Sequence, residues 1–170
     1  DARLIGTAGA LDDSRGIDTL YRAFHRLAER DPQLHLVLAG YASPDSPIPA
    51  HPRLLHLGKL PHDRMPIFFN ALELAILCIR DTAFGRYSFP QKAYEMLACR
   101  IPLVAAAVGS IGDLLKDTPH CFYQPDDAQD LADKIADQLN QPRPPELPIP
   151  TWADQAEKLE RLLLNYSVAN

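Results

Sequence analysis

Short apolar segments alternate with amphipathic segments along most of this chain, and this alternation constrains the fold more than any other feature. Strands are expected at residues 4–9, 34–40, 54–58, 73–79, 103–108 and 121–123. Helices are expected at residues 16–30, 65–71, 111–116, 127–139 and 151–166, with a further helix that begins near Ser88. Strands that alternate with helices pair in parallel through right-handed crossovers. The sequence therefore predicts an α/β, Rossmann-like domain with about six parallel strands and helices on both faces of the sheet.

Proline positions divide the chain into three parts. The 170 residues are 46% hydrophobic, which is enough for one good core and little for two. Residues 1–141 are predicted to form that domain, and residues 142–150, which are rich in proline, an extended and semi-rigid connector. Residues 151–166 are predicted to form a final helix with Thr151 as its cap. The first strand begins close to Asp1, as expected for a piece cut from a larger protein.

The segment from residue 88 to residue 99 carries the clearest functional signal. Ser88 and Gln91 fit a capping box, and Pro90 lies in the first turn, where its missing N–H costs nothing. This helix start follows an apolar strand, and open parallel sheets bind ligands outside the carboxyl ends of their strands, against helix N-termini. Lys92 and Glu95 are then placed to grip a ligand. They are also three residues apart, as in an ordinary solvated ion pair on a helix.

A second candidate site lies after the first strand. Gly9 stands at the predicted strand end, and Arg15 and Gly16 stand at the start of the next helix. Glycine allows a ligand to approach the backbone closely, and a guanidinium beside a helix N-terminus suits a diphosphate. The alternative is that Arg15 is a solvated residue at a helix start, because a lone Gly-x-x-Gly turn is a weak signal.

Together these motifs resemble the donor-binding lobe of retaining glycosyltransferases with the GT-B fold, the group 1 or family 4-like enzymes. The resemblance rests on the string S-x-P-x-K-x-x-E-x-L-A from Ser88, on the P-L-V-A that follows, and on the order of motifs from Leu4 to the last helix. It implies that Glu95 holds the nucleotide ribose hydroxyls. It implies that Arg15 takes the place of a lysine that neutralises the donor diphosphate, and that Lys92 approaches the phosphates or the sugar.

The chain matches the family at further positions and differs from it at two. Phe84 and Gly85 resemble the Phe-Gly of the family, so the loop of residues 81–87 is expected to border the sugar pocket. Lys59 and Leu60 resemble the segment beside the nucleotide base, although a strand end followed by a helix-start proline explains them as well. Ala10 replaces an arginine of the family, and Tyr87 occupies the place of a glutamate that contacts the donor sugar. These departures put the usual diphosphate pose and full catalytic competence in question.

The resemblance thus implies the donor-binding domain of an enzyme that moves a sugar from a nucleoside diphosphate sugar to an acceptor with retention. Arg15 and Lys92 are the candidate catalytic residues, and no cofactor or metal is implied beyond the UDP- or GDP-linked donor. The candidate donor-binding residues are Gly9, Arg15, Lys59, Leu60, Phe84, Gly85, Tyr87, Ser88, Pro90, Lys92 and Glu95. The alternatives are a nucleotide-sugar epimerase lobe of the same architecture and a non-catalytic nucleotide-binding or interaction module.

The resemblance also predicts partners. A GT-B enzyme needs an N-terminal lobe that binds the acceptor, so the isolated chain is expected to be inactive. The helix at residues 151–166 is expected to cross toward that lobe, which is also where any peripheral membrane contact is expected.

Composition excludes several other classes. The net charge is −5 and no Lys/Arg-rich run occurs, which argues against nucleic acid as a partner. No apolar run has transmembrane length and no signal-peptide pattern is present, so a cytoplasmic location is expected. The three cysteines lack metal-ligand spacing and are predicted to be reduced core thiols. The six histidines match no known catalytic spacing and are predicted at the surface or at edges.

Overall fold

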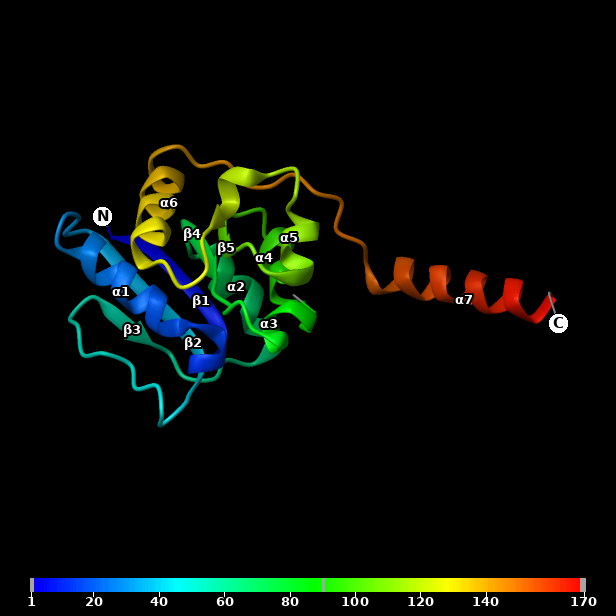
Figure 1. Ribbon diagram of the computed structural model, residues 1–170, viewed down its shortest axis with the longest axis horizontal. Coiled ribbons are helices and arrows are strands. Elements are labelled where there is room, and N and C mark those ends of the chain that lie inside the picture. The colour runs from blue at the N-terminus through cyan, green and yellow to red at the C-terminus, as the bar shows by residue number, and fades with distance from the viewer. Residues whose placement is uncertain (1, 90, 169–170) are drawn as a thin grey trace.

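The computed structural model describes residues 2–89 and 91–168 and confirms the α/β architecture (Figure 1). Six parallel strands form one sheet in the order β3-β2-β1-β4-β5-β6. The strands are β1 (Arg3–Leu11), β2 (Leu34–Ala42), β3 (Leu54–His56), β4 (Leu74–Leu77), β5 (Leu103–Ala106) and β6 (Phe122–Tyr123). Each predicted strand is present, and several are shorter at their ends than the apolar run that predicted them.

Helices cover both faces of the sheet. They are α1 (Ile17–Ala28), α2 (Met65–Asn70), α3 (Ala83–Tyr87), α4 (Gln91–Ala98), α5 (Gly109–Leu114), α6 (Ala128–Asn140) and α7 (Trp152–Val168), with single 3-10 turns η1 (Asp13–Arg15), η2 (His62–Arg64) and η3 (Pro119–Cys121). Figure 1 shows α1 and α6 beside each other, and their extensive contact places them on the same face. The helices α2, α4 and α5 cover the other face.

Strand residues alternate between two apolar cores. In β2, Leu36 and Leu38 point to the core under α1 and α6, whereas Val37 and Ala39 point to the core under α2 and α4. The same alternation occurs in β4 and β5. A strand buried on both faces reads as a continuous apolar run, which is why periodicity and length located these strands in the sequence.

The segment before α4 differs from its prediction. Residues 83–87, expected as a loop, form the short helix α3, which Thr82 caps by accepting a hydrogen bond from the Gly85 N–H. Ser88 is the C-terminal cap of α3, and its hydroxyl donates to the Gly85 carbonyl at 3.1 Å. The predicted capping box of Ser88 with Gln91 is wrong, because the Gln91 N–H donates to the Phe89 carbonyl at 2.9 Å and not to the Ser88 hydroxyl. Pro90 lies outside the described residues.

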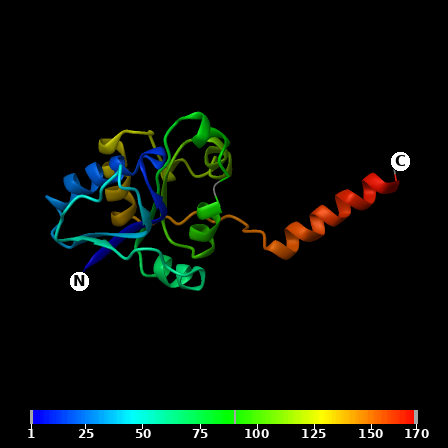
Figure 2. The same ribbon diagram turned by 90° about the horizontal axis from the view of Figure 1, so that it is seen from below.

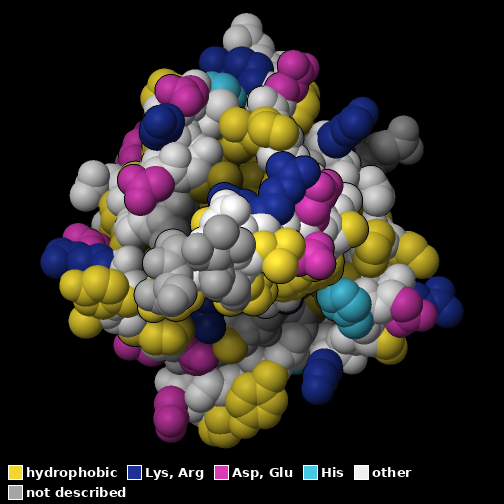
Figure 3. Space-filling view, turned by 90° about the vertical axis from the view of Figure 1, so that its right-hand side faces the viewer, with side chains coloured by type: hydrophobic (Ala, Val, Ile, Leu, Met, Phe, Trp, Pro, Cys, Tyr) yellow, Lys and Arg dark blue, Asp and Glu magenta, His cyan; other side chains and the backbone are white. Residues whose placement is uncertain are grey.

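The last part of the chain leaves the domain. After α6 the chain continues without helix or strand, and Leu147 and Ile149 pack against the core under α2 and α4. Helix α7 then projects away from the sheet in both views (Figures 1 and 2). Its side chains are exposed from Trp152 to Tyr166, and Figure 3 shows hydrophobic and charged side chains close together on this side of the molecule.

Among the described residues, no helix combines the length and the hydrophobicity needed to cross a bilayer.

Candidate functional site

A cavity of about 370 Å³ opens at the carboxyl ends of β1 and β4. These two strands are neighbours in the middle of the sheet, and the chain runs outward in opposite directions from them, toward β3 on one side and β6 on the other. Such a switch point leaves a crevice that open α/β sheets use for ligands. The cavity therefore lies where the sequence predicted the site, between the loop after β1 and the start of α4.

Gly9 forms part of the floor of the cavity. Its φ angle is +130°, a conformation that favours glycine, and it pairs with Gly40 of β2. A Cβ atom at Gly40, where φ is +136°, would lie 1.8 Å from the Gly9 carbonyl oxygen. On the cavity side, a Cβ atom at Gly9 would lie 3.3 Å from Cε of Lys92. The absence of a side chain at Gly9 thus lets the Lys92 stem cross the strand end.

Arg15 enters the cavity from η1, the turn between β1 and α1. Asp12 caps this turn by accepting a hydrogen bond from the Arg15 N–H at 3.1 Å. The guanidinium carbon lies 4.8 Å from the centre of the Phe84 ring, within the range of a cation–π contact. The Arg15 Nε is buried and has no hydrogen-bond partner, so a donor is available to an anionic ligand.

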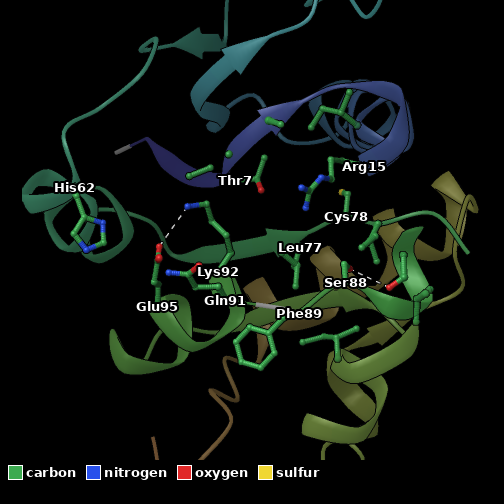
Figure 4. Close-up of a pocket in the computed structure, with 18 residues that line it drawn as sticks. Thr7, Arg15, His62, Leu77, Cys78, Ser88, Phe89, Gln91, Lys92 and Glu95 are labelled. Carbon is green, nitrogen blue, oxygen red and sulfur yellow. Dashed lines mark hydrogen bonds and ion pairs between the residues drawn. The ribbon is translucent and has the colours of Figure 1, made fainter. Parts of the chain in front are cut away.

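Lys92 and Glu95 enter from α4 (Figure 4). The Lys92 Nζ lies 3.5 Å from the Glu95 Oε2, and the two side chains are 36% and 21% exposed. The Glu95 Oε2 is nevertheless buried without a hydrogen-bond partner. The ion pair predicted as the alternative to ligand binding is therefore present, but it leaves a carboxylate oxygen able to accept further hydrogen bonds.

Several residues that line the cavity were not among the sequence candidates. They are Thr7, Ala8, Ala10, Ile17, His62, Leu77, Cys78, Ile79, Phe89, Gln91, Val108 and Ile111. Thr7 is a buried polar residue within an apolar strand, a signal that the sequence offered. Burial raises the pKa of the Cys78 thiol to about 12, so Cys78 supplies no thiolate nucleophile at neutral pH.

The predicted donor-binding residues fall into two groups. Gly9, Arg15, Gly85, Ser88, Lys92 and Glu95 line the cavity together. Phe84 does not line the cavity, but its ring contacts the Arg15 guanidinium. Lys59 and Leu60 precede η2 and do not line the cavity either, whereas His62 of η2 does. Tyr87 is 90% exposed and lies outside the lining.

The electrostatics of the cavity favour an anion. Two cationic side chains, Arg15 and Lys92, face it, and Glu95 is the one carboxylate among its lining residues in the described chain. A guanidinium and an ammonium can neutralise a diphosphate, while a carboxylate suits hydroxyl donors such as those of a ribose. Within the described residues, no group of three or more His, Cys, Asp or Glu side chains is arranged to hold a metal ion.

The chain is similar to one known family over most of its length. A model of the family described as glycosyl transferases group 1 matches residues 2–141. No match was found among curated proteins.

Solved structures share the fold. The C-terminal domain of the glycosyl transferase group 1 family protein LpcC from Francisella tularensis is 18% identical with a TM-score of 0.66, over 82% of this chain and 76% of that one. Alr3699/HepE from Anabaena, solved in complex with UDP-glucose, is 22% identical with a TM-score of 0.67, over 82% of this chain and 39% of that one. An α,α-trehalose-phosphate synthase (UDP-forming) from Burkholderia xenovorans, solved with glucose-6-phosphate, is 15% identical with a TM-score of 0.62, over 83% and 36%. The chain thus spans well under half of the two longer proteins.

Proposed function

Because the chain belongs to the group 1 glycosyl transferases, with the fold of their C-terminal GT-B lobe, we propose that its cavity binds a nucleoside diphosphate sugar. The observation that carries the proposal is the grouping of Arg15, Lys92 and Glu95 around one cavity at the centre of the sheet. The cations suit the diphosphate, and the Glu95 carboxylate, whose Oε2 has no hydrogen-bond partner, suits the ribose hydroxyls. The complex of HepE with UDP-glucose supports this class of ligand.

The chemistry proposed is transfer of the sugar to an acceptor with retention of the anomeric configuration. Transfer breaks the bond between the sugar and the diphosphate, and negative charge develops on the leaving oxygen. Arg15 and Lys92 would stabilise that charge because both are held in place before the reaction, which makes an electrostatic contribution large. An N-terminal lobe would supply the acceptor and close the cavity, so the chain alone is proposed to bind the donor without turnover.

Lys92 offsets one departure from the family pattern. Ala10 lines the cavity at the position where the family has an arginine, which removes one expected cation. The Lys92 Nζ, brought across Gly9 to the same cavity, restores a count of two. Two cations are what a diphosphate needs, and this supports the donor-binding proposal.

Ala10 also supports a second candidate function, a non-catalytic nucleotide-binding module, because it stands where the family has an arginine. Thermal-shift and calorimetric titrations with UDP, GDP, ADP and their sugars test the binding step. A nucleoside diphosphate that stabilises the protein supports the proposal, and the absence of any effect at millimolar concentration refutes it. Product formation with the two-lobed protein then separates transferase from binding module, and the anomeric signals of the product in NMR report retention or inversion.

A further inference from the structure

Arg80, which follows β4, ties three segments of the chain together. Its Nε donates to the Asp13 carbonyl oxygen at 2.7 Å, and its Nη2 donates to the Asp13 carboxylate at 2.7 Å. Further bonds reach the carboxylates of Asp18 at 2.8 Å and Asp126 at 2.7 Å. Arg80 thus holds the turn η1, the first turn of α1 and the loop between β6 and α6.

Arg80 contacts the chain on both sides of Arg15. Arg80 fixes both the main chain and the side chain of Asp13, two residues before Arg15. On the other side, Gly16 has a φ angle of +65°, and a Cβ atom there would lie 3.2 Å from Cγ of Arg80. The Arg80 side chain therefore packs under the backbone that carries Arg15.

The main chain of Arg80 supports the other neighbour of Arg15. The Thr82 N–H donates to the Arg80 carbonyl at 2.9 Å, and a Cβ atom at Gly85 would lie 2.1 Å from that same oxygen. This close approach seats α3 against Arg80. Helix α3 carries Phe84, whose ring lies against the Arg15 guanidinium. The turn that carries Arg15 and the helix that carries Phe84 are thus both in contact with Arg80.

Arg80 also forms ion pairs with three carboxylates around the turn η1. Asp13 is close to Arg15 in sequence and 77% exposed, and Asp18 and Asp126 lie in the same cluster. Partial burial lowers the pKa of Arg80, but the hydrogen bond to Asp13 and the charges of Asp18, Asp126 and Asp13 together raise the pKa above its usual value. Arg80 thus offsets the negative charge of these carboxylates beside the backbone that carries Arg15.

We propose that Arg80 is a positioning residue that keeps Arg15 directed into the cavity, where it binds the diphosphate of the donor. This inference rests on the proposed function and adds to it a residue that touches no ligand. Arg80 lies outside the lining of the cavity, so its effect on binding passes through Arg15.

Titration calorimetry of UDP and uridine, or of GDP and guanosine if the screen selects that base, tests the proposal. Arg80→Met is expected to lower the affinity for the diphosphate by about tenfold while the affinity for the nucleoside stays within twofold. Arg22→Met is the matched control, because Arg22 contacts Asp18 and the Asp126 carbonyl in the same cluster but does not contact Asp13. It is expected to leave both affinities unchanged.

A double-mutant cycle identifies the route of the effect. In an Arg15→Ala background, Arg80→Met is expected to change the diphosphate affinity by less than twofold. An undiminished loss in that background, an equal loss for the nucleoside, or an unchanged diphosphate affinity in Arg80→Met overturns the inference.

If Arg80→Met does not fold, Arg80→Lys decides in the same way: its single ammonium cannot span the three carboxylates, so a selective loss of diphosphate affinity is expected. If the unmodified protein binds no nucleoside diphosphate, the proposed function fails as well, and the two failures are thereby distinguished.

Discussion

At the scale of single residues, Glu95 has the most specific expected role. Its Oε2 is 3.5 Å from the Lys92 Nζ and has no hydrogen-bond partner, so a ligand hydroxyl that donates to the carboxylate would form a charge-assisted bond. Glu95→Gln should weaken binding of the ribonucleoside diphosphate by roughly 1–3 kcal/mol, as measured by calorimetry. A deoxyribose analogue should lose less, because it has one hydroxyl fewer to donate. Equal losses for both nucleotides would mean that Glu95 serves mainly as the partner of Lys92.

Among the residues that line the cavity, the sequence indicated the charged ones more completely than the neutral ones. Arg15, Lys92 and Glu95 were identifiable because each stands near a strand end or a helix start, where open α/β sheets bind ligands, and because the family resemblance assigned them roles. His62 was missed since it depends on the path of the chain after β3, which no local pattern specifies. Lys59 and Leu60 were proposed from the resemblance alone. They precede the turn η2, and the chain reaches the cavity wall only at His62, the first residue of that turn.

At the scale of elements, β1 and β2 lie close together at the paired residues Gly9 and Gly40. An added Cβ at Gly40 would overlap the Gly9 carbonyl, and the positive φ angle strains any other residue. Gly40→Ala should therefore lower the free energy of unfolding by about 2 kcal/mol or more in chemical denaturation. Gly112→Ala in α5 is the control: nothing lies within 4 Å of its added Cβ, and stability should change by no more than about 1 kcal/mol. Similar losses in both variants would contradict the close approach.

Helix α7 is expected to be the least protected helix of the molecule. Its 17 residues are held by a local cap, in which Thr151 and Asp154 exchange hydrogen bonds, and by the Glu157–Arg161 pair. Helices without tertiary packing are marginally stable in water. Hydrogen exchange should be much faster in α7 than in α6, whose buried face packs on α1. Equal protection would show that α7 is covered in solution.

The sequence predicted strands that are buried on both faces of the sheet well, and predicted short elements in the loops between them less well. Strands such as β2 and β5 are buried on both faces and stand out as apolar runs. Helix α3 was missed because it has five residues and contains Gly85, so neither periodicity nor propensity indicates it. The wrong assignment of Ser88 has the same cause. Because α3 was not predicted, its C-terminal cap Ser88 was taken as the N-terminal cap of α4.

At the scale of the whole molecule, the buried thiols and phenols predict a loss of stability in alkali. Burial raises the pKa of Cys78 and of Tyr21 to about 12 and that of Cys121 to about 11. Above pH 9 the unfolded chain releases these protons before the folded chain does, so the unfolded state binds fewer protons and the free energy of unfolding falls as pH rises. The decrease should run from about pH 9 toward pH 12 at up to about 1.4 kcal/mol per pH unit for each group.

Denaturation under reducing conditions at pH 8 to 11 checks this. Cys78→Ala should make the decline with pH shallower, whatever it does to stability at pH 8. Val104→Ala, which removes buried carbon but no titrating group, should lower the curve without changing its slope. An unchanged slope in Cys78→Ala would mean that the thiol does not take part.

The anchoring of the connector gives α7 a mechanical meaning. A helix of this length is a lever arm of about 25 Å. This arm pivots at the connector, where Leu147 and Ile149 are partly buried and pack against the core under α2 and α4. Residues of the connector line a groove together with Leu97 and Ala98. A force on α7 is therefore transmitted to the C-terminal end of α4, and the same eight-residue helix carries Lys92 and Glu95 into the cavity.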